Sequence, residues 1–382
     1  MRILHLGTGA TPEEVNGVNS VVWTLAAEQS RIGDQVAFLM GGNSPAAKTE
    51  AHCDALSIKA FWVPANRFSY HLESVERVLE DFCPDVVHMH AIFIPRQATL
   101  SRFLYQKRIP YVISPHGGCS PRVLDRQQWK KWPYSVLIEK PRFRHAAAII
   151  PITVHERKDA SDYVGNRGRL SAPVGNPVSI PPGVCWPGDP GNCRRVVSLT
   201  RFSVFPKGLD RLVEIARRLP TANFCVYGQG ERSKDLAKLI RTAPPNVSFL
   251  PPVFGNEKWQ VLQSAALYLQ TSRWEGFGIA AAEAVAVGLP CAVLPGEEPL
   301  REILQQAAAG FALSADCSQA AAEIEGVLAD RDSRQRRGAA GARYAREHWS
   351  ATSVAEAVAS RYQEAICTAG SSELRPAIAK LQ

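Results

Sequence analysis

The sequence predicts an α/β protein built from two doubly wound domains, each with a parallel sheet between layers of helices. Short apolar runs alternate with helical patterns in the first half of the chain. Proline and glycine then crowd residues 173–191, and the alternation starts again after them. A chain of 382 residues is also longer than one ordinary core supports, which favours two domains.

The first domain is expected over residues 1–180 as a Rossmann-like domain. Its strands are short buried runs rich in β-branched residues. Its first helix carries Val18, Val22 and Leu25 at helical spacing, and Gly33 should lie just after that helix. The expected strands are residues 3–7, 35–40, 85–89, 110–114 and 146–151, and the expected helices are residues 18–31, 75–82 and 98–106.

The second Rossmann-like domain is expected over residues 181–350. Ligands of doubly wound sheets bind at the carboxyl ends of the strands, and a pair of such domains usually binds its ligand in the cleft between them. The expected strands are residues 195–199, 222–227, 247–250, 267–271 and 290–294, with a last one near 313–315, and the expected helices are residues 208–218, 231–241 and 256–265.

Residues 351–382 are expected to form a separate C-terminal segment. A helix is predicted over residues 351–367, because Val354, Val358 and Tyr362 share one face. The tail that follows it should be loose.

The composition is that of a soluble globular protein, with 46% hydrophobic and 21% charged residues. There is no run of about 18 apolar residues, so the sequence predicts no membrane-spanning helix. Glu13 and Glu14 follow the first apolar run too closely for a signal peptide. Nine scattered cysteines without metal-ligand spacing favour free thiols in a reducing compartment, and therefore a cytoplasmic protein.

The net charge of +8 comes mainly from one stretch of the chain. Between Arg96 and Arg144 there are eleven Lys and Arg residues against two acidic ones. A solvated face is one interpretation. The other is attraction to an anionic membrane surface, with Trp129 and Trp132 at the headgroup level. Nucleic acid is not an expected partner, because no recognisable module carries stacking aromatics.

The most informative segment is Arg273-Trp274-Glu275-Gly276-Phe277-Gly278, which leads into a helix that carries Glu283. A glycine turn at a helix N-terminus frees backbone N–H groups for an anion such as a phosphate, and the two acids can accept hydrogen bonds from hydroxyl groups. Eight residues of regular helix rise about 12 Å. The paired carboxylates of glycosidases lie about 5 to 9.5 Å apart. We therefore expect a binding pair and not a hydrolytic couple.

A second motif follows the first strand of the second domain. Arg201 and Lys207 lie in the short loop before Gly208, where a helix begins. Two cations beside a helix N-terminus at the carboxyl end of a strand suit a diphosphate. The next strand ends in Gly228-Gln229-Gly230, which is either a tight turn or a close backbone approach to a base or phosphate.

Histidines at strand ends are further candidates in the first domain. His116 lies in a glycine-rich loop after a strand, which favours a ligand contact. His88 and His90 alternate on a strand and share one face, but no third metal ligand is evident, so we expect no metal. The glycine spacing after Gly7 is wrong for a nicotinamide site, and Gly17 at the helix start is a possible phosphate contact.

Taken together, these motifs resemble those of the retaining GT-B glycosyltransferases of family 4, over nearly the whole chain. The most specific element is the segment from Glu275 to Glu283 with its Glu-Gly-Phe-Gly sequence. The other elements that follow the order of the family are Asp85-Val86-Val87-His88-Met89-His90, Pro115-His116-Gly117, Arg201 with Lys207-Gly208, Tyr227-Gly228-Gln229-Gly230 and Gly288-Leu289-Pro290. The helix 351–367 looks like the family's final helix, which crosses back onto the first domain.

The resemblance implies a role for each matched residue. The donor is a nucleotide-sugar, the acceptor is a glycan or a lipid-linked molecule, and neither a metal nor another cofactor is expected. The implied catalytic residues are His116, Arg201, Lys207 and Glu275, with the two cations on the diphosphate. The implied donor-binding residues are Gly17 near the phosphates, Gly228, Gly230 and Val253 near the base, Phe277 and Gly278 at the sugar, and Glu283 at the ribose.

Two alternatives share this architecture. One is a UDP-sugar 2-epimerase, which would convert a donor without an acceptor. The other is a non-catalytic protein that binds sugar nucleotides. The sequence leaves open the sugar, the base, the acceptor and the linkage.

Overall fold

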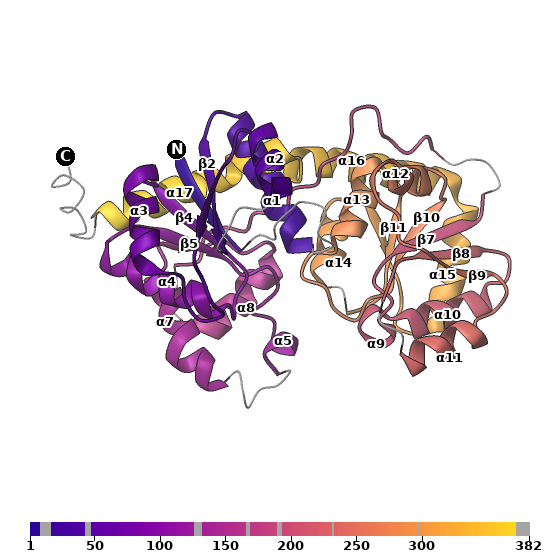
Figure 1. Ribbon diagram of the computed structural model, residues 1–382. Helices are drawn as coiled ribbons and strands as arrows, with labels where there is room; N and C mark the ends of the chain where they lie inside the picture. The colour runs from indigo at the N-terminus through magenta and orange to yellow at the C-terminus, as the bar shows by residue number, and fades with distance from the viewer. Residues whose placement is uncertain are drawn as a thin grey trace. The chain divides into compact units, whose positions relative to one another are not determined.

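The structure of the protein is a computed structural model that describes residues 1–7, 17–42, 47–125, 132–165, 169–188, 193–230, 233–296 and 298–371, except the side chains of residues 306, 370 and 371. The chain divides into two compact units. The first comprises Met1–Pro177 together with Ala351–Gln382, and the second is Val178–Ser350. Each unit holds one six-stranded sheet whose strand pairs are all parallel, which confirms the predicted α/β class (Figure 1).

The first sheet has the strand order β3-β2-β1-β4-β5-β6, with β1 near its centre. Because the chain moves from β3 back to β4 beside β1, the strand order reverses between β1 and β4, as in other doubly wound sheets. The strands are β1 (Arg2–Leu6), β2 (Gln35–Gly41), β3 (Lys59–Val63), β4 (Val86–His90), β5 (Tyr111–Ser114) and β6 (Ala148–Ile149).

Helices cover both faces of this sheet. Leu4 and Leu6 pack into one core with α3, α4, α7 and α8, whereas Ile3 packs into another with α1 and α17. This division follows from the period of two along a strand. The helices and helical turns are α1 (Gly17–Arg31), α2 (Ala47–Ala55), α3 (Leu72–Phe82), α4 (Pro95–Gln106), α5 (Pro121–Asp125), η1 (Ser135–Glu139), α7 (Lys140–His145), α8 (Val154–Val164) and α17 (Ala351–Ser371).

The C-terminal helix α17 belongs to the first unit, although 173 residues of the second unit precede it. Its apolar face, with Val354, Val358 and Tyr362, is buried against α1 and the sheet. Burial of that face explains why the helix returns to the first unit. The predicted helix was shorter, because it stopped at residue 367.

The second sheet has the order β12-β11-β10-β7-β8-β9, with β7 between β10 and β8. Its strands are β7 (Arg195–Leu199), β8 (Asn223–Tyr227), β9 (Val247–Leu250), β10 (Leu267–Gln270), β11 (Cys291–Val293) and β12 (Gly310–Ala312). Its helices are α9 (Val204–Lys207), α10 (Leu209–Arg218), α11 (Lys234–Thr242), α12 (Gly255–Gln263), α13 (Ile279–Val287), α14 (Glu298–Gln306), α15 (Cys317–Ala329) and α16 (Arg331–His348).

Some elements differ from the prediction. The last strand is Gly310–Ala312 and not residues 313–315, because Gly310 fits against β11, where a Cβ atom would lie 2.5 Å from the Cys291 carbonyl oxygen. Strand β3, the helical segment η1 and the helices α2, α5, α7, α8, α9, α14, α15 and α16 were not predicted. In particular, Lys207 ends the short helix α9 and does not lie in a loop. All nine cysteines are free. Among the described residues, no helix combines the length and apolar character that crossing a bilayer requires.

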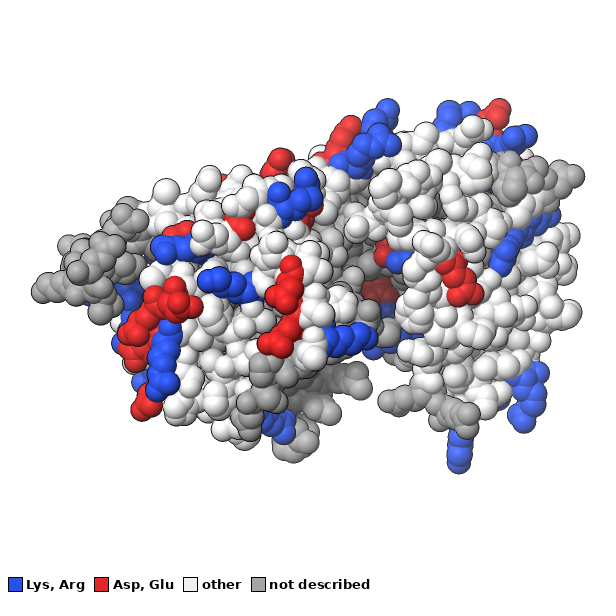
Figure 2. Space-filling view, turned by 45° about the horizontal axis from the view of Figure 1, so that its top comes forward, with Lys and Arg blue, Asp and Glu red and all other residues white. Residues whose placement is uncertain are grey.

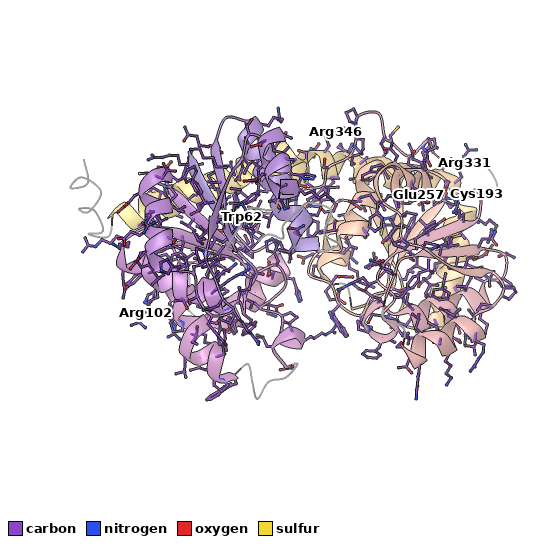
Figure 3. All side chains as sticks on the ribbon, in the orientation of Figure 1. Trp62, Arg102, Cys193, Glu257, Arg331 and Arg346 are labelled. Carbon is purple, nitrogen blue, oxygen red and sulfur yellow. The ribbon has the colours of Figure 1, made fainter. Side chains whose placement is uncertain are left out.

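Among the described residues of the basic stretch 96–144, the basic side chains do not all lie at the surface. Arg142 is buried and paired with Glu139 at 2.7 Å, and Lys107 pairs with Glu76. Arg102, by contrast, points outward from α4 (Figure 3). On the face that Figure 2 shows, basic and acidic side chains are interspersed. Part of the positive charge of this stretch therefore belongs to the core.

Candidate functional site

The predicted site residues of the second unit gather at the carboxyl ends of neighbouring strands. Arg201 follows β7, and Lys207 ends the short helix α9 after it. Glu275 lies in the loop after β10, which is hydrogen-bonded to β7 in the sheet. Because these strands are parallel neighbours, their carboxyl ends lie side by side, which is where doubly wound sheets bind ligands.

The Arg201 loop is fixed by the two glycines of the next strand's turn. Thr200 N–H donates to the Tyr227 carbonyl at 2.9 Å, and Phe202 N–H donates to the Gln229 carbonyl at 2.8 Å. A Cβ atom on Gly228 would lie only 1.8 Å from the Thr200 carbonyl oxygen, and one on Gly230 would lie 2.4 Å from that of Phe202. The close backbone approach considered for these glycines is therefore to the protein's own loop, which positions Arg201.

Lys207 and Glu275 form an ion pair, and both side chains are largely shielded from solvent, with 12% and 22% exposure. The Ser272 hydroxyl donates to the same Glu275 oxygen at 3.2 Å. The backbone next to Lys207 is also held in place. The Thr271 hydroxyl donates to the Lys207 carbonyl at 2.9 Å, and Gly208 lies so close to the Thr271 carbonyl that a Cβ atom would be 2.0 Å away. These contacts hold both Lys207 and Glu275 in place.

Unlike Lys207, Arg201 is not held by an ion pair with a described residue. Its side chain is exposed, and no hydrogen bond or ion pair joins its guanidinium to another of the residues that the structure describes. A guanidinium with no partner among the described residues keeps its N–H donors for an anionic ligand.

Glu283 lies on α13, and Lys258 of α12 donates to it at 2.7 Å. Of the two acids only Glu283 is on a helix, so the regular-helix estimate of their separation does not apply. Tyr268 on β10 is buried, and burial raises the pKa of its hydroxyl well above the ordinary value. Cys291 raises this pKa further, and so do the charges of Glu275 and Glu283. Each carboxylate is matched by one lysine, so both remain hydrogen-bond acceptors.

The remaining predicted residues of this unit lie at the start of α13 and after strands β8 and β9. Gly278 caps α13 in the left-handed conformation, so the free N–H groups of the first turn of α13 follow it directly. The Phe277 side chain is buried, with its ring 5.4 Å from that of Trp349, which leaves only its backbone for a ligand. Val253 follows β9, next to the Gly228 turn after β8.

In the first unit, His116 follows β5 with a φ of 52°. Its Nε2 lies 3.0 Å from Nδ1 of His90, and burial lowers its pKa to about 4. The Glu156 carboxylate accepts hydrogen bonds from the backbone N–H groups of Gly117 and Ile152, so it holds the loop of His116. Burial raises the pKa of Glu156 to about 7, and these two hydrogen bonds oppose the rise. Gly17 is the first residue of α1, and residues 8–16 lie outside the described residues.

The structure supplies the third histidine that the sequence analysis did not identify. His5 on β1 is in register with His88 on β4, and its ring lies with those of His88 and His90 in one buried cluster whose candidate ligand atoms are within 4.8 Å of one another. All six ring nitrogens of this cluster already have hydrogen-bond partners. Hydrogen bonding therefore accounts for the cluster, and metal coordination would require breaking it.

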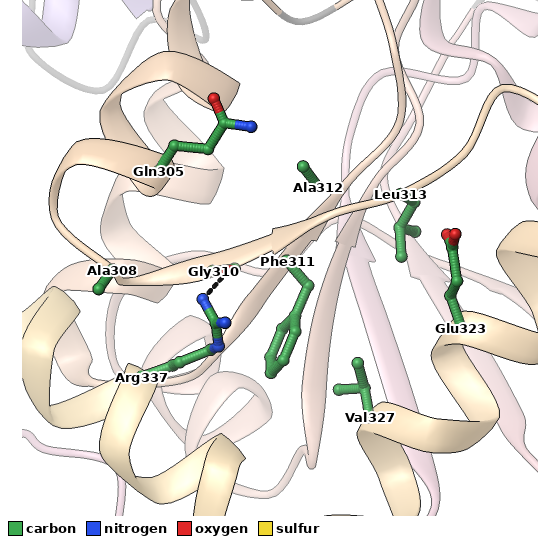
Figure 4. A pocket seen from close by; sticks show the side chains of 9 residues that line it. All are labelled: Gln305, Ala308, Gly310, Phe311, Ala312, Leu313, Glu323, Val327 and Arg337. Carbon is green, nitrogen blue, oxygen red and sulfur yellow. Dashed lines mark hydrogen bonds between the residues drawn. The ribbon is translucent and has the colours of Figure 1, made fainter.

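A hollow in the second unit lies apart from these pairs. It has a volume of about 550 Å³ beside the edge strand β12, and Arg337 closes one side by donating to the Gly310 carbonyl at 2.6 Å (Figure 4). None of the predicted site residues lines it, so we assign it no role in the site.

Four residues that the sequence analysis did not identify contact the predicted site residues or the histidine cluster. Lys258, which pairs with Glu283, and Gln29, which is hydrogen-bonded to His5, have no local signal, because their partners lie on other elements. His5 was detectable only from the pairing of β1 with β4. Glu156 had a signal, since Thr153 and Glu156 have the spacing of a helix capping box, and Thr153 does accept from Glu156 N–H at 3.0 Å.

Solved structures share this architecture. Sucrose-phosphate synthase from Thermosynechococcus elongatus aligns with a TM-score of 0.74 at 17% identity, over 96% of this chain and 99% of that chain. The Anabaena protein HepE, solved in complex with UDP and glucose, aligns with a TM-score of 0.69 at 16% identity, over 95% and 99%. Two doubly wound units with a returning C-terminal helix form the GT-B fold, as the resemblance implied.

Sequence comparison adds the chemical class. Residues 16–175 match the glycosyl transferase 4-like domain, and residues 190–344 match the glycosyl transferases group 1. The GDP-mannose:cellobiosyl-diphosphopolyprenol alpha-mannosyltransferase of Xanthomonas campestris is 28% identical over 281 residues, which is 69% of this chain and 70% of that protein. The protein is therefore a glycosyltransferase. In particular, the chain belongs to the group 1 glycosyltransferases of the family 4 type.

Proposed function

We propose that the protein transfers a hexosyl group with retention from a UDP- or GDP-sugar to a glycan or lipid-linked acceptor, in cell-surface polysaccharide synthesis. The observation that carries this proposal is the Lys207–Glu275 pair at the carboxyl edge of the second sheet, with Arg201 in the segment between β7 and α9. HepE was solved with UDP, and the Xanthomonas relative is named for GDP-mannose and a diphosphopolyprenol acceptor, which supports both donor classes and a lipid-linked acceptor.

In the proposed site, Arg201 and Lys207 bind the donor diphosphate. When the phosphates take over Lys207 as a partner, the Glu275 oxygen that it held becomes available to a sugar hydroxyl. Glu283, held by Lys258, accepts from the ribose hydroxyls. Gly17 contacts the phosphates, Gly228, Gly230 and Val253 flank the base, and the backbone of Phe277 and Gly278 contacts the sugar, which His116 also faces.

The chemistry follows from these charges. The bond from the sugar to the diphosphate lengthens, positive charge develops on the sugar ring, and negative charge develops on the leaving phosphate. The guanidinium and ammonium stabilise that phosphate in the place of a metal ion. The acceptor hydroxyl then attacks from the face that the phosphate leaves, which retains the configuration. The protein acts by positioning and charge stabilisation.

The proposal predicts an α-configured product from an α-configured donor. We expect the purified protein, given UDP- and GDP-hexoses together with a polyprenyl-diphosphate glycan, to release nucleotide with only one of the donor series. The measurement is nucleotide release, with the anomeric coupling of the product read by NMR. A β-configured product would contradict retention.

The same experiment without acceptor separates the alternatives. An epimerase would convert the donor sugar with no acceptor present, and a binding protein would bind the nucleotide without turnover. The glycosyltransferase requires both substrates for sustained nucleotide release.

We also propose that the first unit docks on an anionic membrane at the inner face of the plasma membrane. Trp132 and Leu137 are 64% and 74% exposed, and Val136 and Ile138 beside them are also exposed. An exposed apolar run of this kind next to the basic residues of stretch 96–144 suits insertion at the headgroup level.

Replacing both Trp132 and Leu137 with serine should lower liposome binding by roughly tenfold or more, because each buried apolar side chain contributes about 1.5–3 kcal/mol. The measurement is sedimentation with liposomes that contain anionic lipid, at low and high salt. Ile240→Ser, which changes an exposed isoleucine of α11 in the other unit, is the control. Binding that ignores salt, anionic lipid and the double substitution would rule out docking through this surface.

A further inference from the structure

An unbroken line of hydrogen bonds runs from Gln29 on α1 to His116 in the first unit. Gln29 Oε1 lies 2.8 Å from His5 Nε2, and His5 Nδ1 lies 3.0 Å from His90 Nε2. His90 Nδ1 in turn lies 3.0 Å from His116 Nε2. The line crosses from α1 over β1 and β4 to the loop after β5, so four separate elements contribute to it.

The members of this line are neutral. Gln29, His5 and His90 are at most 1% exposed. Burial lowers the pKa of His5 and His116 to about 4, and that of His90 well below its ordinary value. A neutral imidazole has one N–H and one acceptor nitrogen, so the direction of one hydrogen bond dictates the direction of the next.

The direction follows from the amide of Gln29. Its oxygen can only accept, so His5 carries its proton on Nε2 and accepts at Nδ1. His90 must then donate from Nε2 to His5 and accept at Nδ1. The proton of the last bond therefore comes from His116 Nε2, which leaves His116 Nδ1 as an acceptor.

A second branch holds the amide in this orientation. Gln29 Nε2 lies 3.4 Å from the Tyr362 hydroxyl, which lies 2.7 Å from His88 Nδ1. A phenol is a better donor than acceptor and imidazole nitrogen is a good acceptor, so Tyr362 donates to His88 and receives the amide N–H. His88 Nε2–H then donates to the Ser114 hydroxyl at 2.8 Å. Reversing the amide would require every bond in both branches to reverse.

We propose that Gln29 is a positioning residue that fixes the tautomer of His116 through His5 and His90. His116 thereby carries its proton on Nε2 and offers Nδ1 as an acceptor to a hydroxyl of the bound sugar. The hydrogen bond from a sugar hydroxyl to His116 Nδ1 rests on the proposed function, whereas the tautomer of His116 is a property of the first unit alone.

The tautomer is directly measurable. In the full chain labelled with ¹⁵N-histidine, long-range ¹⁵N–¹H correlation spectra distinguish Nε2–H from Nδ1–H imidazole, and His116→Asn identifies the His116 signals. We expect the Nε2–H form in the native protein. Gln29→Met keeps the length of the side chain and removes both hydrogen bonds, so His116 should become a mixture of tautomers. Tyr362→Phe, which leaves the Gln29–His5 bond possible but frees the amide to turn, should produce a mixture too and serves where Gln29→Met does not fold.

Activity gives the second measurement. Mixed tautomers of His116 should lower kcat/KM by roughly twofold to tenfold, because only the fraction of the protein in the competent tautomer offers Nδ1 to the sugar hydroxyl. An Nδ1–H tautomer of His116 in the native protein, or a tautomer unchanged by both substitutions, would overturn the inference. Transfer unaffected by His116→Asn would instead overturn the proposed role of His116, while the NMR result would still decide the tautomer.

Discussion

Replacing Lys207 with alanine should lower kcat/KM for transfer by at least about a hundredfold. Loss of one charged hydrogen bond to the diphosphate corresponds to about 2–3 kcal/mol. The substitution also leaves Glu275 without its cation, at the place where the donor phosphates are proposed to bind. Arg201→Ala removes a contact of the same kind but leaves no described carboxylate unpaired. We therefore expect Lys207→Ala to be the more damaging of the two.

The Lys207–Glu275 pair also predicts that the effects of substituting its two members on kcat/KM are not additive. In the double variant Lys207→Ala with Glu275→Ala, the repulsion between the carboxylate and the phosphates disappears, so the combined loss should be smaller than the sum of the two single losses. Nucleotide release by the four proteins measures this coupling. Lys238→Ala, which changes an exposed lysine of α11, is the control. Unchanged kcat/KM in both Lys207→Ala and Arg201→Ala would end the assignment of the donor site.

Lowering the pH from 7.5 to 5 should destabilise the first unit by about 6 kcal/mol. Burial lowers the pKa of His5, His88, His90 and His116 below the ordinary value of 6.5. Below pH 6.5 the unfolded chain therefore binds protons at these histidines, whereas the folded chain does not. This proton binding favours the unfolded state, so the free energy of unfolding decreases as the pH falls below 6.5. At pH 5 the loss is about 2 kcal/mol for each histidine.

Glu156 acts in the opposite direction. Its folded pKa of about 7 is above the ordinary value of 4.5, so the folded state binds a proton first as the pH falls. This gain returns about 2 kcal/mol between pH 7.5 and 5, against about 8 kcal/mol lost at the four histidines. The difference is the net loss of about 6 kcal/mol.

Urea unfolding of the full chain at pH 7.5, 6.5 and 5, followed by a probe in the first unit, measures this dependence. Glu156→Gln removes the opposing contribution, so the free energy of unfolding of this variant should fall more steeply with decreasing pH than that of the native protein. A free energy of unfolding that stays constant from pH 7.5 to 5 would show that these histidines are not held neutral.

Local sequence patterns determined most of the fold. The alternation of apolar runs and amphipathic helices placed most of the strands, because the periods of strands and helices are visible in any short window. The alternation did not predict β3, and it placed the last strand wrongly. That strand is Gly310–Ala312, where the lack of a side chain on Gly310 allows close packing against the Cys291 carbonyl. Local motifs also placed Arg201 and Lys207 after one strand and Glu275 after another.

The tertiary structure decided which of these residues meet. The sequence by itself determined that cations and acids occupy the ends of strands in the second domain, since glycine turns and strand ends are local features. It did not determine that Lys207 pairs with Glu275, that Lys258 pairs with Glu283, or that His5 joins His88 and His90. Those contacts depend on strand order and on which helix covers which face, and both are set by burial of apolar surface across the whole unit and not by neighbours in the chain.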